Sequence, residues 1–375
     1  MRTAAILIAV LACATTAFAG SWTVNANFTA SVAMGVAAAD DFAVIAGGDS
    51  GTGAIMWRST DQGATWGEAN LDAKPLMLMA TGASGKSAVA SGMFTVVHST
   101  DSGVSFTKST GTGAEGPCQS ASAFRDTAGA FGITGEALLF NGVGVSTNDG
   151  STFTASSIWG ENSTYAARYG TFPTSTTWYV SAGSWPENNN KLQTGEVELT
   201  QRIRVHALKR QVRFNNPNRA AAPEGYVAGI AKTTDGGKTW TTVFSKMGEF
   251  YFNGIDCWDE NNCAAVGEAD SGSAPGARIY VTSDGGKTWT RTMFNAGAAN
   301  SIMAVTYISA TELWASGGAM VTGIPGHFHH STDGGKTWTM DVVPGAYGTS
   351  LSFNNGRGYA TVMTPEQVCG LATYA

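Results

Sequence analysis

Apolar and polar positions along residues 262–294 form a unit that recurs through most of the chain. The unit opens with an apolar run, AAVGEA, and passes through a Gly-rich connection to a second apolar segment, ARIYV. A polar turn, TSDGGKTW, follows, and a short segment, TRTMF, closes the unit. Short apolar runs bounded by turn residues are typical of β-strands. The unit therefore predicts strands joined by hairpins.

Six copies of the polar turn, here called the box, punctuate the chain. Their spacings are 40, 47, 87, 49 and 49 residues. A period in the forties with strand-type segments indicates a β-propeller with four strands in each blade. The copies begin at Ser59, Ser99, Ser146, Thr233, Thr282 and Ser331.

The residues of the box fit the tight end of a hairpin. Its third residue accepts backbone N–H bonds, and its glycine takes a positive φ without a steric clash. The last residue, Trp or Phe, anchors the next strand in apolar packing. These aspartates are therefore interpreted as structural and not catalytic. The third positions are Asp61, Asp101, Asn148, Asp235, Asp284 and Asp333, and the aromatic positions are Trp66, Phe106, Phe153, Trp240, Trp289 and Trp338.

The blade count depends on the long gap and on the two ends of the chain. The gap of 87 residues holds either a blade without a box or one blade with a long insertion at 186–224, which we favour. The C-terminal stretches LSFNNGRGYATVM and QVCGLATYA resemble inner strands, and GSWTVNANF near the N-terminus resembles an outer strand. Strands from both ends that share one blade would close the ring. We expect an all-β fold, a single seven-bladed propeller of four-stranded antiparallel blades over 20–375.

The insertion differs in composition from the rest of the chain. From Gln201 to Arg219 it holds six basic residues and no acidic residue. Strand alternation places it on the face opposite the boxes, where it is either a ligand contact, a solvated loop or an artefact of the gene model. The predicted partner-binding residues are Trp185, Arg202, Arg204, Lys209, Arg210 and Arg213.

Residues 1–19 resemble a secretory signal peptide, with an apolar run from Ala4 to Ala14 and a small-residue cleavage motif. No later apolar stretch is long enough for a membrane span. The net charge of −6 argues against nucleic acid as the partner. We expect a secreted or extracytoplasmic protein, and Asn27 and Asn162 begin glycosylation sequons that matter only in a eukaryote.

Four cysteines remain after the signal peptide is removed. Cys257 and Cys263 flank a polar turn and are predicted to form a disulfide, whereas Cys118 pairs with Cys369 only by elimination. The histidine cluster His327, His329 and His330 has no carboxylate or cysteine next to it in the sequence, so we predict neither a metal site nor a cofactor.

The box resembles the Asp box, or BNR repeat, of sialidases, sortilin-type receptors, xyloglucanases and photosystem II assembly-factor propellers. In size and repeat style, with phrases such as TSDGGKTW and IDCWDENNCAAVGE, the chain is most similar to the assembly-factor propellers. That resemblance implies a monomeric, non-catalytic scaffold that recognises a protein or glycan partner, and we expect the partner to bind on the face opposite the boxes. The alternative is a glycoside hydrolase of the sialidase-like superfamily. However, residues 20–57 lack the early arginine that a sialidase needs, and the presequence favours secretion over a thylakoid-lumen location.

Overall fold

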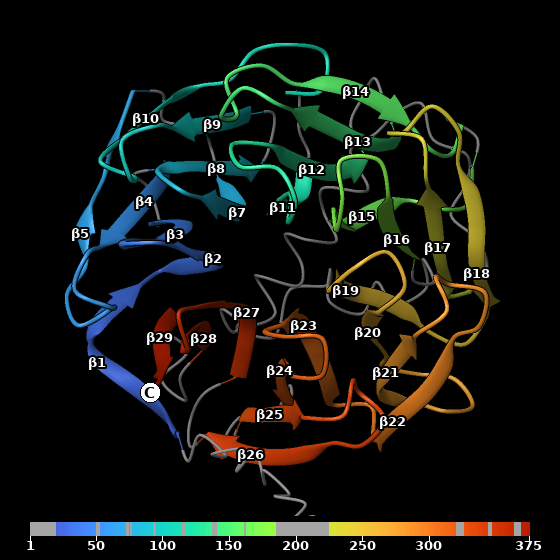
Figure 1. Cartoon of the computed structure of the whole chain (residues 1–375). Coiled ribbons are helices and arrows are strands. Elements are labelled where there is room, and N and C mark those ends of the chain that lie inside the picture. Colours follow the sequence, from blue (N-terminus) through green and yellow to red (C-terminus); the bar gives the residue numbers. More distant parts are fainter. Residues whose placement is uncertain are drawn as a thin grey trace, which may run out of the picture.

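The computed structural model describes residues 20–49, 53–72, 75, 77–92, 95–114, 118–136, 141–160, 163–184, 225–319, 326–343, 347–363 and 369–375. These residues form seven sheets arranged as blades around a central axis (Figure 1). The predicted all-β class, the propeller and its blade number are confirmed. Among the described residues, no helix has the length and hydropathy needed to cross a membrane.

Each blade is an antiparallel sheet whose first strand lies nearest the axis. Blade 2 gains a short fifth strand, β6, which pairs in parallel with β10. Blade 1 consists of β2 Val32–Ala39, β3 Phe42–Asp49, β4 Gly53–Ser59 and β5 Gly67–Glu68. Blade 2 consists of β6 Asn70–Leu71, β7 Leu78–Ser84, β8 Ser87–Gly92, β9 Thr95–Ser99 and β10 Ser105–Lys108. Blade 3 consists of β11 Cys118–Ala123, β12 Phe131–Glu136, β13 Asn141–Ser146 and β14 Thr154–Ser157. Blade 4 consists of β15 Ala167–Thr171, β16 Trp178–Ser184, β17 Val227–Thr233 and β18 Thr241–Met247, and blade 5 consists of β19 Tyr251–Cys257, β20 Cys263–Ala269, β21 Gly276–Thr282 and β22 Thr290–Ala296. Blade 6 consists of β23 Asn300–Tyr307, β24 Leu313–Ala319, β25 Gly326–Ser331 and β26 Thr339–Val343. Blade 7 consists of β27 Tyr347–Asn354, β28 Arg357–Met363, β29 Cys369–Tyr374 and β1 Trp22–Ala30.

The ring is closed by both ends of the chain within one blade. β1 pairs antiparallel with β29, beginning with Trp22 opposite Tyr374, so the first strand completes the last blade. The Trp22 ring lies 5.5 Å from that of Tyr374, 4.7 Å from that of Phe328 and 5.7 Å from that of Trp314, measured between centroids. Phe328 and Trp314 belong to blade 6, so this aromatic cluster also joins the closing blade to its neighbour.

The core consists of apolar layers between neighbouring blades. The middle strands β16 and β20 are buried along their whole length, because the adjacent blades cover both of their faces. The outer strand β18 is mostly exposed. This difference explains why middle strands read as continuous apolar runs and outer strands read as polar ones.

All boxes lie on one face of the ring, here called the box face. Box residues donate backbone N–H bonds to the turn between the first two strands of the same blade: Gly236 to Thr176 at 2.9 Å, and Gly334 to Thr311 at 2.8 Å. The hairpins between the second and third strands therefore end at the opposite face.

The box aspartate closes its turn with hydrogen bonds from side chains and backbone. In the last copy, Asp333 Oδ1 accepts bonds from the Ser331 hydroxyl at 2.9 Å and the Thr337 N–H at 2.9 Å. Its Oδ2 accepts a bond from the Thr337 hydroxyl at 2.6 Å. The bonds from Thr337 lower the pKa of Asp333 to about 2. Asn148 keeps the Oδ1 bonds, from the Ser146 hydroxyl and the Thr152 N–H.

We expect Asp333→Ala to lower the free energy of unfolding by about 1–2 kcal/mol, because exposed hydrogen bonds are worth about 0.5–1.5 kcal/mol each. Asp333→Asn should cost less, since Asn148 shows that an amide keeps the Oδ1 bonds. The folded-state pKa of Asp333 lies below its ordinary value of 3.8, so this stabilisation is present above pH 3.8 and is lost as the pH falls toward about 2. Thermal unfolding between pH 7 and pH 2 measures both effects. A pH-independent difference between wild type and Asp333→Asn would contradict the assignment.

We expect Trp22→Ala to lower the free energy of unfolding by about 3 kcal/mol, because it removes a large aromatic group from the closing seam. Chemical denaturation of a chain of residues 20–375 measures the change. Thr23→Ala is the control, since Thr23 is an exposed neighbour on the same strand. Equal losses in the two variants would show that the aromatic cluster does not hold the ring closed.

Candidate functional site

The innermost strands carry a β-bulge at the same level in every blade. In each strand, pairing with the second strand skips one residue near the end where the strand begins. A bulge inserts an extra residue and re-aims the side chain. The skipped residues are all buried, and they are Met34, Met79, Gln119, Arg168, Asn253, Met303 and Thr349. All but Arg168 line a cavity of about 140 Å³ in the central channel.

This bulge ring has a polar arc in blades 3 to 5 and is otherwise apolar, except for Thr349 of blade 7. Gln119, Arg168 and Asn253 come from the consecutive blades 3, 4 and 5, whereas the methionines come from blades 1, 2 and 6. Arg168 donates from Nη1 to Gln119 Oε1 at 2.7 Å and from Nε to the Gly183 carbonyl at 2.8 Å. The polar arc thus lies beside the end of β16, where the chain leaves blade 4 on the face opposite the boxes.

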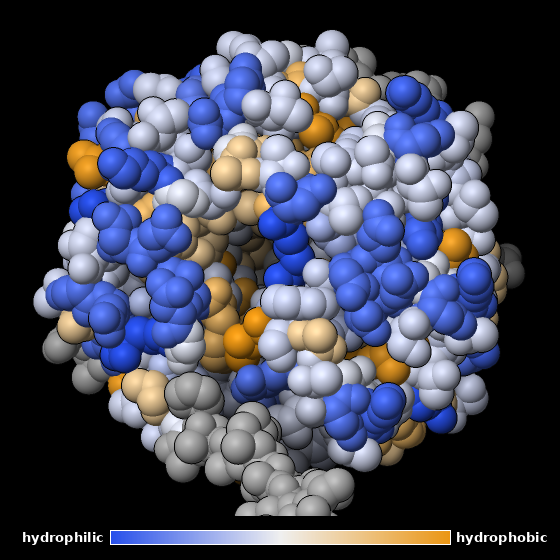
Figure 2. Space-filling model, in the orientation of Figure 1, coloured by the Kyte–Doolittle hydropathy of each residue, from blue (hydrophilic) through white to orange (hydrophobic). Residues whose placement is uncertain are grey.

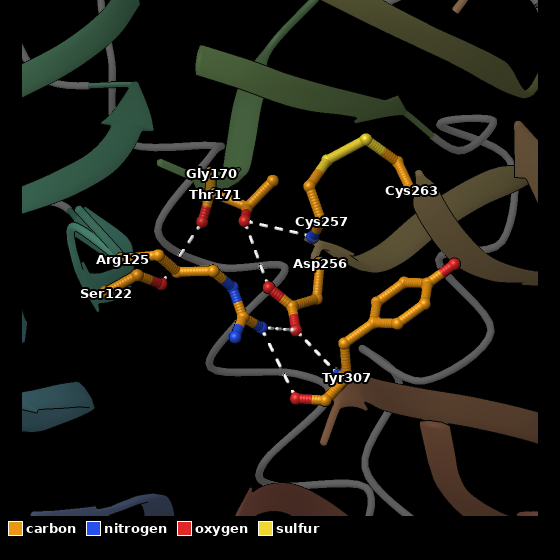
Figure 3. A network of polar contacts seen from close by, with 8 residues as sticks. All are labelled: Ser122, Arg125, Gly170, Thr171, Asp256, Cys257, Cys263 and Tyr307. Atoms are coloured by element: carbon orange, nitrogen blue, oxygen red, sulfur yellow. Dashed lines mark hydrogen bonds and ion pairs between the residues drawn. A yellow bond between two sulfur atoms is a disulfide. The ribbon is translucent and has the colours of Figure 1, made fainter. Parts of the chain in front are cut away.

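A charged network lies at the other end of the channel, on the box face (Figure 3). Arg125, in the first turn of blade 3, donates from Nη2 to Asp256 Oδ2 at 2.7 Å and to the Tyr307 carbonyl at 3.4 Å. Asp256, on β19, also accepts the Thr171 hydroxyl at 3.0 Å and the Tyr307 N–H at 2.8 Å. Residues from blades 3, 4, 5 and 6 therefore meet at this carboxylate.

Arg125 is only partly engaged in this network. Its Nη2 makes the bonds to Asp256 and Tyr307, while Nε and Nη1 donate to no described residue. Figure 3 shows Nη1 turned away from Asp256. The Arg125 side chain is 30% exposed, against 17% for Asp256, and its guanidinium lies 5.2 Å from the centroid of the Trp258 ring. Nη2 is fixed by these bonds, whereas the N–H groups of Nη1 have no acceptor among the described residues.

The mouth around Arg125 is a cavity of about 270 Å³ with walls of different character. Blades 3 to 5 contribute Arg125, Thr171 and Asp256, whereas blades 1, 2 and 7 contribute mainly small and apolar groups such as Ala38, Ala83 and Leu351. Figure 2 shows a mouth of the ring with hydrophilic groups on one side and apolar surface on the other. Such a mouth can hold an anionic group at one wall and an aliphatic chain at the other.

The partner-binding residues predicted from the sequence lie outside the described residues. These are Trp185, Arg202, Arg204, Lys209, Arg210 and Arg213, and the sequon residue Asn162 lies outside as well. β16 pairs directly with β17, beginning with Ser184 opposite Val227, so residues 185–224 connect adjacent strands of blade 4. Asn27 lies on β1.

The histidine cluster contributes to the packing of blade 6. The His330 ring stacks on Trp314 at 4.1 Å between centroids, and its Nε2 lies 3.0 Å from Glu312 Oε1. Burial lowers the pKa of His329 to about 4, so its imidazole is neutral near pH 7. Within the described ranges, no group of three His, Cys, Asp or Glu residues has metal-site geometry.

The predicted Cys257–Cys263 disulfide is present and joins β19 to β20 beside the charged network. Asp256 immediately precedes it, so the disulfide braces the strand that carries the network's carboxylate. The second pairing, Cys118 with Cys369, which was expected by elimination, is not formed, because these two buried residues belong to different apolar clusters.

The sequence analysis missed Arg125 and Asp256. They lie 131 residues apart, and neither belongs to a repeated motif. One signal was available: each is a charged residue at the end of an apolar inner strand, in SASAFR and YFNGID. In a chain with 13% charged residues, such positions merit attention as candidate channel groups.

Comparisons with known proteins agree with this architecture. Residues 329–340 match the model of the BNR/Asp-box repeat. No curated protein matches the sequence. The solved structure of YCF48 bound to a D1 peptide has a TM-score of 0.56 and 14% identity, covering 95% of this chain and 96% of its own. YCF48 from Cyanidioschyzon merolae has a TM-score of 0.55 and 16% identity, covering 94% and 98%.

A propeller of the WD40 type matches this chain to a similar degree. The WD40 propeller domain of Doa1 has a TM-score of 0.55 and 10% identity, covering 95% of this chain and 97% of its own. The resemblance to Asp-box propellers is thus confirmed for the repeat and the fold. At these identities, the structural matches establish the fold alone.

We expect Asp256→Ala to lower the free energy of unfolding by about 2 kcal/mol, because it leaves the Tyr307 N–H and the Thr171 hydroxyl without their acceptor. Arg125→Met should cost less than about 1 kcal/mol, since Arg125 is partly exposed and its alkyl chain is retained. Thermal unfolding of both variants measures the difference. If Arg125→Met costs as much as Asp256→Ala, the guanidinium is a structural tie and not an available binding group.

Proposed function

We propose that the protein is an exported, non-catalytic binding propeller whose partner is a polypeptide segment that enters the channel mouth on the box face. The observation that carries the proposal is the Arg125 guanidinium. Its Nη2 is fixed by Asp256, and its Nη1 is open to a cavity of about 270 Å³ that Arg125 lines. A guanidinium held in this way is preorganised, so a ligand loses little by ordering it.

The chemistry of the mouth favours a carboxylate as the recognised group. Arginine donates charge-assisted N–H···O bonds to carboxylates, and the N–H groups of Nη1, which no described residue accepts, are available for such a bond. The groups opposite it, including Ala38, Ala83 and Leu351, suit an aliphatic chain next to that carboxylate. A peptide supplies both features, either at its C-terminus or at an acidic side chain.

A solved structure of the same fold supports a peptide as the ligand class. YCF48, with a TM-score of 0.56 to this chain, has been solved bound to a D1 peptide. The present chain is 14% identical to it, so the support concerns the class of ligand that a propeller of this fold accepts. The signal-like residues 1–19 place the encounter outside the cytoplasm in our proposal.

The basic segment from Gln201 to Arg219 is proposed as a second contact for the same partner. It belongs to the connection between β16 and β17, which leaves the sheet at the face opposite the boxes. The positive segment attracts an acidic partner through its net charge, whereas Arg125, whose charge is balanced by Asp256, contributes unused N–H donors.

We expect random peptides of about a dozen residues, panned on the mature protein, to yield binders that depend on one carboxylate. Amidation of that carboxylate, or its replacement by the amide side chain, should weaken binding about tenfold, the effect of losing about 1.4 kcal/mol. Arg125→Gln should weaken binding by a similar factor, because it removes the guanidinium, which is the charged hydrogen-bond donor. Fluorescence anisotropy of each labelled peptide measures the affinity.

Arg357→Gln is the matched control, because Arg357 is an arginine of blade 7 bonded to the Gln62 carbonyl, away from the Arg125 mouth. It should leave the affinity unchanged. Replacing the basic residues of the segment with glutamine should reduce the affinity and its salt dependence if the basic segment is the second contact. The residues to be replaced are Arg202, Arg204, Lys209, Arg210 and Arg213. Binding that survives Arg125→Gln refutes the mouth as the site. Hydrolysis of fluorogenic glycosides that one carboxylate substitution abolishes would refute the non-catalytic proposal.

A further inference from the structure

The outer edges of blades 2 and 3 are covered by the chain that arrives from the preceding blade. In blade 2, residues 70–72 run parallel to β10, and the N–H groups of Asn70 and Asp72 donate to the carbonyls of Val104 and Phe106 at 3.0 and 3.1 Å. In blade 3, residues 110–113 do the same. Thr110 donates to Ser151 at 3.0 Å, and Gly113 donates to Phe153 at 3.4 Å.

The acceptors occupy the same two positions in both boxes, the sixth and the eighth. Val104 and Ser151 are sixth residues, and Phe106 and Phe153 are eighth residues. Both phenylalanines are fully buried. The box therefore does more than end a hairpin, because its last three residues present backbone acceptors along the outer edge of the blade.

The last three boxes present the same positions without an occupant among the described residues. Their sixth and eighth residues are Lys238 and Trp240, Lys287 and Trp289, and Lys336 and Trp338. The connections that leave β18 and β22 span only residues 248–250 and 297–299, so they cannot run along an outer edge. No residue in the described ranges pairs with the outer edges of β18, β22 and β26, which lie on the rim of the ring (Figure 1).

The box sequence changes together with this coverage. Covered boxes end in Val-Ser-Phe or Ser-Thr-Phe, the last three boxes end in Lys-Thr-Trp, and the first box, 59–66, ends in Ala-Thr-Trp. The lysines are exposed and the tryptophans are half-buried, so each uncovered edge combines unpaired backbone groups, a cation and an indole. Lysine at an edge discourages indiscriminate strand pairing and still permits pairing with a complementary segment.

Blade 5 has the most consistent charge of the three uncovered edges. Arg291 lies on β22 itself, which carries no acidic residue, and Lys287 precedes the strand. The carboxylate of Asp284 is turned into the box, where Thr288 donates to both of its oxygens. Phe294 is 38% exposed, and the Arg291 guanidinium lies 4.9 Å from its ring centroid.

The other two edges carry acidic groups beside their cations. In blade 4, Lys246 is paired with Glu249 at 3.2 Å. In blade 6, Asp341 lies on β26. The charge of these edges is therefore partly neutralised, and blade 5 is the edge best suited to an acidic segment.

We propose that the outer edge of blade 5 accepts an extended acidic segment of a partner polypeptide as a parallel fifth strand. Its backbone N–H groups bond to the carbonyls of Lys287 and Trp289, as residues 110–113 bond to blade 3. Its acidic side chains face Lys287 and Arg291, and its apolar side chains pack on Trp289. Backbone pairing supplies affinity, and the cations supply selectivity. This surface is separate from the channel mouth.

The test uses an acetylated and amidated peptide of alternating valine and glutamate, about eight residues long, an ordinary strand length. We expect it to bind the mature protein and to slow amide exchange in the fragment that covers residues 285–296. N-methylation of alternate residues, which removes the N–H donors, should weaken binding at least tenfold, as should Lys287→Glu combined with Arg291→Glu. Anisotropy of the labelled peptide measures each affinity.

Two controls separate this edge from other acidic-peptide sites. Lys108→Glu reverses a charge on β10, whose outer edge β6 already covers, and should leave the affinity unchanged. Arg125→Gln should also leave it unchanged, whereas it weakens the ligands of the channel mouth. A peptide of alternating valine and lysine serves as the charge-reversed control. Absence of binding, binding that is insensitive to N-methylation, or equal binding of this control peptide overturns the proposal. Concentration-dependent dimerisation that Lys287→Glu with Arg291→Glu abolishes would assign the edge to a second copy and overturn it as well.

Discussion

The pairing of β1 with β29 is the contact on which the rest of the propeller depends. A blade buries its faces only against neighbouring blades, so an open ring would expose two apolar faces at once. The two ends of the chain remove this problem by completing one sheet, and Trp22 fastens that sheet to Trp314 and Phe328 of blade 6. The channel, its two mouths and the rim exist only when the ring is closed.

Within that circle, repetition builds the scaffold, and departures from repetition create the candidate sites. Every innermost strand has a bulge at the same level, yet the bulged residue is polar in blades 3 to 5 and methionine in blades 1, 2 and 6. Boxes recur in six blades, yet within the described part of the chain the arriving segment covers the outer edges of only two. The same geometry thus carries different chemistry around the ring.

The sequence predicted what local chemistry determines. The box has its turn residues at fixed offsets, so its structural role, the blade period and the closing strand all follow from the printed letters. The Arg125–Asp256 pair does not, because ring closure brings together residues 131 positions apart that share no motif. The bulges are equally hidden, since simple alternation assigns Arg168 and Asn253 to faces that the extra residue changes. The basic segment 201–219 stays a prediction, because it lies outside the described residues.

The Arg125 side chain also changes how blade 4 depends on its neighbours. Arg125 reaches from blade 3 to Asp256 of blade 5 and the Tyr307 carbonyl of blade 6, so it forms a chord across the ring past blade 4. Blades 3 and 5 are therefore linked directly at the box face as well as through blade 4. Because a partly exposed ion pair contributes at most about 1 kcal/mol, this link orients Arg125 more than it stabilises the ring. A ligand that binds Arg125 is thereby coupled to the relative positions of blades 3, 5 and 6.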